Sequence, residues 1–322
     1  MKRLLVGPFL SILRRAIGIP QLEAAIRNLS KEVAAAIAFA TTTASLEDLR
    51  LQANVKRRGE GTQTTAALSM DMTLSRAVAQ KDILGFCAQF APLEVEGFEK
   101  VRLGNNHDGG YIFIDDFTDV SVVLSCGISN DVTCDLAFAD RGKQVLQFDH
   151  TVDGPPISNP KFTFRKQAID ASGSIPGSVR LWDIVDKEGN REKADLLLKI
   201  DIDGDEWATF ANFPLEKLKR FRQISCEFHW SSRLKDPEYF SLCLLAITNI
   251  RKAFFPAHLH ANNFRAFINL MGVPIPEVYE VTFVNSELYR PAGRQRSAPS
   301  EIDNPNDPDA PDLFLGSPFG IG

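Results

Sequence analysis

The sequence lacks the features that mark several large classes of protein. Its 36 lysines and arginines stand against 41 aspartates and glutamates, so no basic excess points to nucleic-acid binding. No run reaches the roughly 20 apolar residues that span a bilayer. The five cysteines show neither a CxxC pair nor zinc-type spacing. They therefore predict small buried residues in a reducing, cytoplasmic compartment.

Three regions differ in composition. Residues 1–60 predict an N-terminal helical extension, because residues 22–37 carry one apolar stripe typical of a packed helix or a short, self-associating coiled coil. Residues 1–17 begin with basic and apolar residues but lack a signal-peptide cleavage site, so a packed helix is favoured over peripheral membrane contact. Residues 68–290 predict the main domain. Residues 291–322 are rich in proline and aspartate and predict a disordered or extended surface tail.

The main domain alternates strand-like and helix-like segments, which predicts an α/β fold with a doubly wound, mostly parallel sheet. The strand-like runs are 121–124, 145–148, 161–165, 196–200 and 223–228, and the helix-like runs are 131–140, 179–186, 206–220 and 237–255. Two further strand-like runs, 258–261 and 278–284, are separated by a turn segment at 271–277. Because that segment contains no crossover helix, these two strands are expected to be antiparallel neighbours.

One buried strand runs directly into a group of acids. Leu196–Ile200 is apolar except for Lys199, as expected of a central parallel strand, and Asp201, Asp203, Asp205 and Glu206 follow it. Open α/β sheets bind ligands at the carboxyl ends of their strands, so Asp201 is a candidate ligand-binding residue. The alternative is a solvated strand-to-helix turn.

A second segment has the order of a nucleoside-binding half-sheet. An apolar strand ends in Ser125-Cys126-Gly127, a helix with Asn130 as its predicted N-cap follows, and Asp149 closes the next strand about 22 residues after Gly127. The G-x-G-x-x-G fingerprint of dinucleotide sites is missing, which argues against NAD. S-adenosylmethionine carries no phosphates and makes weaker demands on this loop. The alternative is a generic turn with Asp149 as a solvated strand end.

Six segments together carry a resemblance to a known family. RLGNNHDGGYIFID, VVLSCGISNDVTCDLAFADRG, VLQFDHT, LLLKIDIDGDEW, SCEFHW and VYEVTFVN occur in this order between about Val101 and Asn285. They resemble the FkbM-like group of S-adenosylmethionine-dependent methyltransferases, in the branch with a D-G-G-Y motif. The resemblance implies a class I methyltransferase, with a Rossmann-like, seven-stranded doubly wound sheet whose last strand pair is antiparallel.

The resemblance also implies roles for single residues. Asp108-Gly109-Gly110-Tyr111 would close over the cofactor, Cys126 and Gly127 would run past its methionine part, Asp149 would hold its ribose, and Asp201 would lie near the sulfonium and the substrate. The chain departs from the family at Ser125, where most class I methyltransferases have an acid, and at Asp203, which replaces a glutamate. Residues 302–313 are similar to tails of this family, which implies that part of the tail is ordered.

Candidate catalytic residues follow from the chemistry of methyl transfer to a hydroxyl, which requires removal of a proton. His229 is a candidate base, Glu227 lies on the same face of its strand, and Asp201 is the rival base. A purely structural hydrogen bond is the alternative for His229. Asp201, Asp203, Glu227 and His229 could also bind a divalent cation, but helix capping gathers acids too, so no metal is predicted. His258 and His260 share a face and are candidates for substrate contact or for a structural hydrogen bond.

The sequence therefore predicts methyl transfer from S-adenosylmethionine to an oxygen. The expected acceptor, by family analogy, is a hydroxyl of a sugar or glycan-like molecule. Two alternatives stay open. One is a metal-dependent glycosyltransferase that uses Asp201-Ile-Asp203. The other is a non-catalytic methyltransferase-like scaffold that acts through its N-terminal helices.

Overall fold

The computed structural model describes residues 77–189 and 193–321. The predicted helical extension, residues 1–60, lies outside these ranges. The described residues belong to one compact unit. Among the helices described, none combines the length and the apolar character that crossing a bilayer requires.

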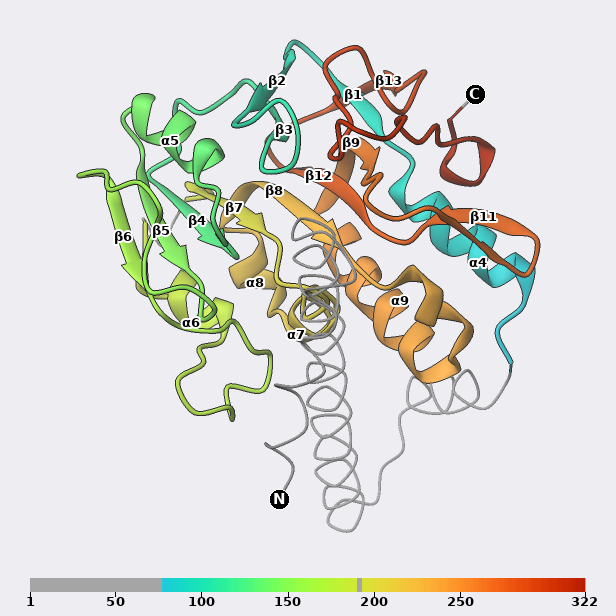
Figure 1. The fold of residues 1–322 in the computed structure, drawn as a ribbon, viewed down its shortest axis with the longest axis horizontal. Helices are drawn as coiled ribbons and strands as arrows, with labels where there is room; N and C mark the ends of the chain where they lie inside the picture. Colours follow the sequence, from blue (N-terminus) through green and yellow to red (C-terminus); the bar gives the residue numbers. More distant parts are fainter. Residues whose placement is uncertain (1–76, 190–192, 322) are drawn as a thin grey trace, which may run out of the picture. The chain divides into compact units, whose positions relative to one another are not determined.

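A seven-stranded sheet forms the centre of the domain (Figure 1). The order of the strands is β6-β5-β4-β7-β8-β12-β9. Their bounds are β4 Val122–Cys126, β5 Gln144–Phe148, β6 Phe162–Arg165, β7 Leu196–Ile200, β8 Phe221–Phe228, β9 Phe254–Ala261 and β12 Tyr279–Asn285. All neighbours are parallel except β12, which runs antiparallel to both β8 and β9. The predicted α/β class and the antiparallel pairing of the last two strands are confirmed.

The sheet has a switch point at β4. The parallel pairs β4–β5 and β4–β7 place the ends of the flanking strands level with the end of β4, because Cys126 pairs with Phe148 on one side and Ile200 on the other. The chain therefore leaves β4 toward one edge of the sheet and later returns on the opposite side. Residues that follow β4, β5 and β7 meet at one rim, which is where open α/β sheets bind ligands.

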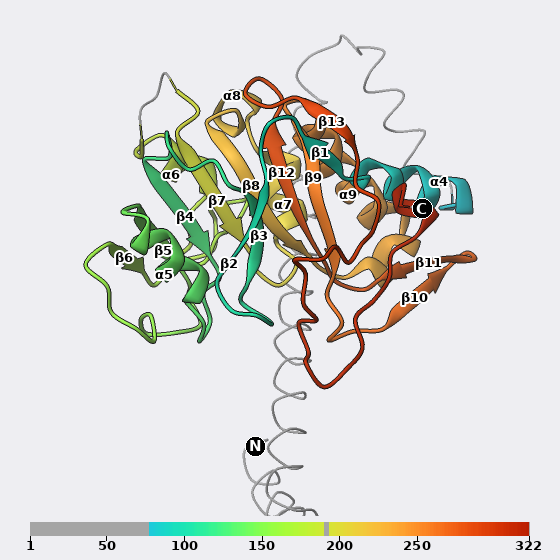
Figure 2. The same ribbon diagram turned by 90° about the horizontal axis from the view of Figure 1, so that it is seen from above.

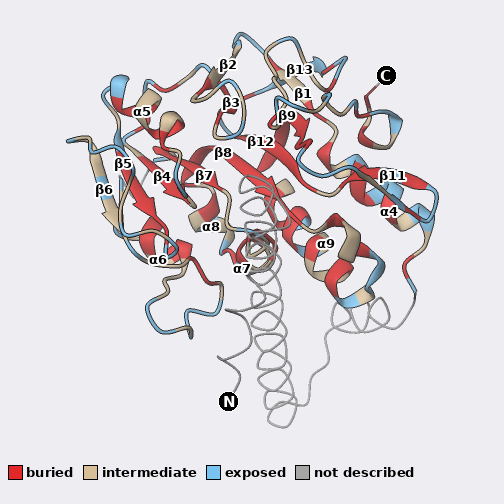
Figure 3. Ribbon diagram, in the orientation of Figure 1, coloured by how far each residue is buried: buried red, intermediate tan, exposed pale blue. Residues whose placement is uncertain are grey.

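Alternation along the strands produces two packed faces. Leu124, Leu146 and Leu198 face the larger apolar core, while Val123 and Leu197 belong to a second cluster around Phe113 and Phe138. Helices α6 Leu181–Val185, α7 Glu206–Asn212, α8 Leu215–Leu218 and α9 Pro237–Arg251 lie on one side, and α5 Thr133–Asp140 lies on the other (Figure 2). Figure 3 shows that the strands between these layers are largely buried.

The face opposite α9 is polar over the antiparallel half of the sheet. Its buried side chains are Gln223, Ser225, Glu227, His258, His260, Glu280 and Thr282. The hairpin of β2 Lys100–Leu103 and β3 Tyr111–Ile114 covers part of it. Gln223 exchanges hydrogen bonds with the backbone of Ile114, and the Thr282 hydroxyl donates to the Ile112 carbonyl. Gln223 and Thr282 are thus paired with the covering hairpin, as their burial demands.

The predicted tail is placed against the body rather than free of it. β13 Pro291–Arg294 pairs antiparallel with β1 Leu93–Val95. Farther along, Asp303, Asn306 and Asp312 bond to side chains of the polar face. Of the two predictions for residues 291–321, the extended surface tail fits the structure and disorder does not, and the partial order that the family resemblance implied is present.

Several predicted element bounds need correction. The single helix predicted at 206–220 is split into α7 and α8, because Pro214 lacks an N–H and Phe213 is extended. α9 ends at Arg251, and residues 254–255 already belong to β9. The segment at 271–277 is not only a turn, since β11 Val273–Pro276 forms a hairpin with β10 Phe267–Leu270.

The helix after β4 also starts later than predicted. α5 begins at Thr133, and the Asp131 carboxylate accepts the hydrogen bond of the Thr133 N–H at 2.7 Å, so Asn130 is not the cap. The remaining helices are α4 Gln80–Cys87 and three short 3₁₀ turns, Ala88–Phe90, Ser231–Lys235 and Ser317–Phe319.

Candidate functional site

The rim after β4 is closed by contacts between backbones. Gly127 has a φ of +79°, and a Cβ there would lie 1.7 Å from the carbonyl oxygen of Asp201. The Asp201 N–H donates to the Cys126 carbonyl at 3.0 Å, and the Lys199 ammonium donates to the Gly127 carbonyl. Glycine is required here because the neighbouring strand end approaches so closely.

Asp149 is used by the chain itself. One carboxylate oxygen accepts the N–H groups of Ile128 and Ser129 at 2.9 and 2.8 Å, and the other accepts the N–H and hydroxyl of Thr151 at 2.7 and 2.6 Å. Burial alone would raise the pKa of Asp149, but these hydrogen bonds outweigh it and lower the pKa. Four bonds occupy the acceptor positions of a carboxylate, so contact with a ribose requires an exchange of partners. That contact stays a prediction.

The D-G-G-Y loop reaches the same rim. The Tyr111 hydroxyl donates to Asp201 Oδ2 at 3.1 Å, and the Lys199 ammonium lies 4.9 Å from the centre of the Tyr111 ring. Each of the two glycines is required by the atoms that surround it. A Cβ on Gly109 would lie 2.7 Å from the Asp131 carboxyl, and a Cβ on Gly110 would lie 1.9 Å from the Asn105 carbonyl oxygen.

Asp108 begins this loop and is exposed to solvent. Its N–H donates to the Asn306 carbonyl at 3.2 Å, which joins the loop to the tail. Partial desolvation of the carboxyl, together with the negative charges of Asp201 and Glu280, raises the pKa of Asp108. The structure therefore brings Tyr111 and Asp201 into contact and places the charge of Asp201 near enough to Asp108 to raise its pKa, while the cofactor contacts that the resemblance implied stay a prediction.

Cys126 cannot offer its thiol to a ligand. The residue is completely buried, and burial raises the pKa of its thiol. All five cysteines are free and buried, as predicted from their apolar surroundings. Only the backbone of Cys126 is available at the rim.

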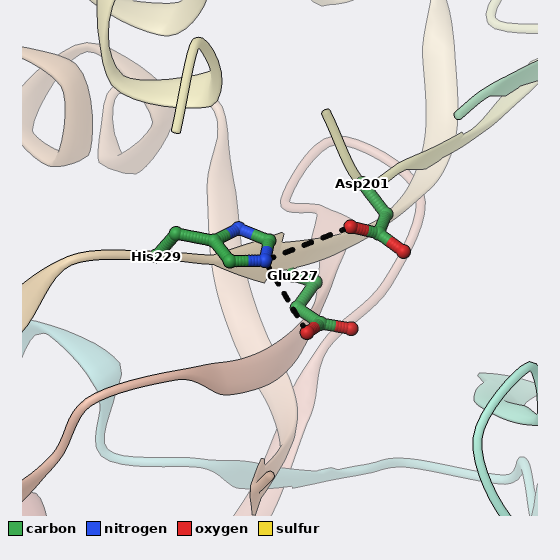
Figure 4. A group of neighbouring side chains, drawn as sticks. All are labelled: Asp201, Glu227 and His229. Atoms are coloured by element: carbon green, nitrogen blue, oxygen red, sulfur yellow. Dashed lines mark ion pairs between the residues drawn. The ribbon is translucent and has the colours of Figure 1, made fainter. Parts of the chain in front are cut away.

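The candidate catalytic residues gather around His229 (Figure 4). Its Nε2 atom lies 3.8 Å from Asp201 Oδ1 and 3.5 Å from Glu227 Oε1. Asp203 Oδ1 is 3.9 Å from the same nitrogen, although the Asp203 side chain is 90% exposed. The His229 side chain is only 9% exposed. The three residues that the sequence selected as catalytic thus meet at one place.

Glu206 completes this group, and the sequence did not single it out as a site residue. It is fully buried and accepts the N–H groups of Ile202 and Gly204 at 2.8 and 2.9 Å. Its Oε1 atom lies 3.2 Å from His229 Nδ1. A signal was present, because an acid at the first position of a helix after a ligand-binding strand end can point back at the rim. We call Asp201, Glu206, Glu227 and His229 the rim cluster.

The rim cluster concentrates negative charge. Burial, and then the charge of Asp201, raises the pKa of Glu227. Burial alone would lower the pKa of His229, but Glu206, Glu227 and Asp201 outweigh it and raise that pKa. Burial alone would lower the pKa of Lys199, but the negative charges around it, that of Asp201 first, outweigh it and raise that pKa. Beside the cluster, burial and the charge of Glu206 raise the pKa of Asp205 to about 7. Such a site favours cations.

The second histidine pair has partners in the tail. His258 Nε2 lies 2.9 Å from Asp303 Oδ1, and His260 Nε2 lies 3.1 Å from both carboxylate oxygens of Asp312. His260 Nδ1 also faces Glu280 at 3.6 Å. Of the two roles that the sequence left open for these histidines, the geometry favours the structural one.

No family model matches the chain, and no curated protein matches it.

Proposed function

We propose that this chain is an S-adenosylmethionine-dependent methyltransferase of the FkbM-like group, with a class I, Rossmann-like sheet. One observation carries the proposal. Asp149 and Asp201 end the two strands that flank β4, and Tyr111 of the D-G-G-Y loop donates a hydrogen bond to Asp201. Tyr111 and Asp201 are 90 positions apart and belong to two of the segments that carry the family resemblance. Their contact lies at a topological switch point of the sheet.

The charge of the rim supports the proposed ligand. S-adenosylmethionine supplies an activated methyl group on a sulfonium cation. Asp201 and Asp203 offer negative charge beside the place where β4 and β7 end, and Asp108 faces the same region. In this proposal Asp108–Tyr111, Asp201 and the backbone of Cys126 and Gly127 hold the cofactor, and Asp149 shapes the loop after β4 or exchanges its bonds for the ribose.

The acceptor is proposed to be a hydroxyl of a sugar or glycan-like molecule. Methyl transfer breaks the bond from sulfur to the methyl carbon and forms a bond from that carbon to oxygen, while the hydroxyl proton leaves. The reacting oxygen must be held in line with that bond and must lose its proton. Asp201, Glu227 and His229 lie together at the rim and supply the polar surroundings for both tasks.

Calorimetric titration of the full chain with S-adenosylmethionine and S-adenosylhomocysteine tests the proposal. We expect saturable binding that is weakened at least tenfold in Asp201→Asn. The matched control is Asp119→Asn, which removes an exposed carboxylate just before β4, at the end of the strands opposite the rim. Absence of binding heat with both ligands would overturn the proposal.

A turnover assay addresses the catalytic residues. His229→Ala is expected to lower turnover of a hydroxyl acceptor by at least tenfold while S-adenosylmethionine affinity stays within twofold. Loss of the folded state in this variant would instead support a structural role for His229, and circular dichroism distinguishes the two.

A specific observation keeps the glycosyltransferase alternative in view. Asp201 and Asp203 of the D-x-D sequence both turn an oxygen toward His229 Nε2, at 3.8 and 3.9 Å. A rise of the thermal midpoint with a uridine-diphosphate sugar, and none with S-adenosylmethionine, would favour this activity. Binding of neither ligand, together with self-association through residues 1–55, would favour the scaffold. The free, buried cysteines support a reducing compartment such as the cytoplasm for any of the three.

A further inference from the structure

The rim cluster contains a histidine nitrogen, Nε2 of His229, that makes no hydrogen bond to residues 77–189 and 193–321. His229 Nε2 faces Asp201, Glu227 and Asp203 at 3.5–3.9 Å, beyond ordinary hydrogen-bond length. The side chain that carries it is 91% buried, since 9% of it is exposed. A polar side chain that is almost fully buried, with a nitrogen that makes no hydrogen bond and is aimed into a group of carboxylates, needs an explanation.

The separations match those of ligand atoms around one ion. Two atoms bound at about 2.1 Å lie about 3.0 Å apart at a right angle and about 3.6 Å apart at 120°. Nε2 lies 3.5 Å from Glu227 Oε1 and 3.8 Å from Asp201 Oδ1, and the three ligand atoms lie within 4.8 Å of one another. The two distances from Nε2 fit a single cation that contacts all three residues. Figure 4 shows the ring and both carboxyl groups turned toward a common point.

Each of the three candidate ligands is held from outside by a different residue. Tyr111 donates to the other oxygen of Asp201 at 3.1 Å. Asn262 Nδ2 donates to Glu227 Oε1 at 3.1 Å. Glu206 Oε1 lies 3.2 Å from Nδ1 of His229, so Nε2 is the nitrogen that faces the other carboxylates. Partners of this kind, especially a carboxylate on the second nitrogen of a histidine, accompany metal ligands in proteins.

We propose that Asp201, Glu227 and His229 bind one divalent cation, with Asp203 as a further oxygen within reach. One imidazole with two carboxylates suits Mn²⁺ or Zn²⁺ better than Ca²⁺, which prefers an all-oxygen set. Three protein ligands leave coordination positions open for water or for a hydroxyl oxygen. If the proposed methyl transfer is correct, the ion takes over the activation of the hydroxyl that the sequence assigned to His229 as a base.

Manganese binding tests this site without S-adenosylmethionine, so a negative result leaves the proposed methyl transfer untouched. The full chain, stripped with EDTA, is titrated with MnCl₂, and free Mn²⁺ is followed by electron paramagnetic resonance. We expect one Mn²⁺ bound per chain and a spin-echo modulation from a directly bound imidazole nitrogen. We also expect the affinity to fall at least tenfold in His229→Ala and in Glu227→Gln.

Glu287→Gln is the matched control. Glu287 follows β12 at the opposite edge of the sheet, where it pairs with Lys219 at 3.0 Å, and its side chain is 64% exposed. This variant should bind Mn²⁺ like the unmodified chain. Glu227→Gln keeps the shape of the side chain, so the test survives if His229→Ala fails to fold. The proposal is overturned if the unmodified chain binds no stoichiometric Mn²⁺, if no nitrogen modulation is seen, or if Glu227→Gln binds as tightly as Glu287→Gln.

Discussion

Replacement of Asp149 by alanine is expected to release the loop after β4. In the structure its carboxylate accepts the N–H groups of Ile128 and Ser129 and both donors of Thr151. Asp149→Ala removes all four bonds at once. The loop 127–131, which precedes α5 and lies at the switch point, then loses its anchor to the neighbouring strand end.

The size of the effect follows from the burial of the donors. Ser129 and Thr151 are exposed, so water replaces the carboxylate there, whereas Ile128 is buried. A hydrogen bond to a charged group contributes about 1.5–3 kcal/mol, and a buried donor left without a partner costs about 1–3 kcal/mol. We expect a loss of about 3 kcal/mol, which lowers the thermal midpoint of a domain of this size by about 6–12 °C.

Thermal unfolding followed by circular dichroism provides the measurement, with Asp153→Ala as the control. Asp153 lies in the same loop region but is fully exposed, in an ion pair with Lys166, and its removal should leave the midpoint unchanged. Equal midpoints for the two variants would show that Asp149 does not hold the loop, and the reasoning would be refuted.

Binding of S-adenosylhomocysteine without its 2′-hydroxyl separates the loop role from a ribose contact. If Asp149 exchanges its bonds for the ribose, the unmodified chain binds this analogue more weakly than S-adenosylhomocysteine. Asp149→Ala then binds the two ligands equally. If the carboxylate only holds the loop, both proteins lose the same factor.

Three other substitutions or conditions give direct readouts. Gly127→Ala should lower the thermal midpoint by several degrees, because its Cβ would meet the Asp201 carbonyl oxygen at 1.7 Å. Asp303→Asn should make the tail sensitive to limited proteolysis at neutral pH, since it loses the charge that faces His258. Burial would raise the pKa of Asp303 but His258 lowers it overall, so its contribution is present above about pH 4 and is lost as the pH falls further. Burial would lower the pKa of His260, but Asp312 and Glu280 raise it to about 10. The contribution of His260 to holding the tail is therefore complete below about pH 6.5. It is lost as the pH rises through about 10, where proteolysis should again cut the tail.

The sequence predicted the parallel half of the sheet well, because buried strands read as continuous apolar runs. Leu196–Ile200 matches β7 at both ends, and the acids that follow it do meet His229. The pairing of β9 with β12 was also predictable, since no helix separates them. The single helix predicted at 206–220 was wrong, because Pro214 interrupts a pattern that is otherwise helical and divides it into α7 and α8.

Side-chain partners across the fold could not be predicted in the same way. The bonds of Asp149 to residues 128 and 129 depend on the positive φ of Ser129, which no local pattern announces. The pairing of Asp303 with His258 joins residues 45 positions apart, and it depends on how the tail crosses the polar face. Glu206 was visible as an acid after a strand, but its position opposite His229 follows only from the packing of β7 beside β8.

The tail also bears on how this domain avoids aggregation. β9 is an edge strand with one partner, β12, yet all eight of its residues are buried. An edge strand with an open hydrogen-bonding side is a template for another chain, and proteins commonly cover it. β1 contacts β9 and is paired with β13, and the segment beyond β13 lies on the His258 and His260 side chains. A chain cut before Pro291 would lose β13, the partner of β1, and the segment over His258 and His260. β1 would then cover β9 less firmly, and we expect the shortened chain to assemble into β-linked oligomers.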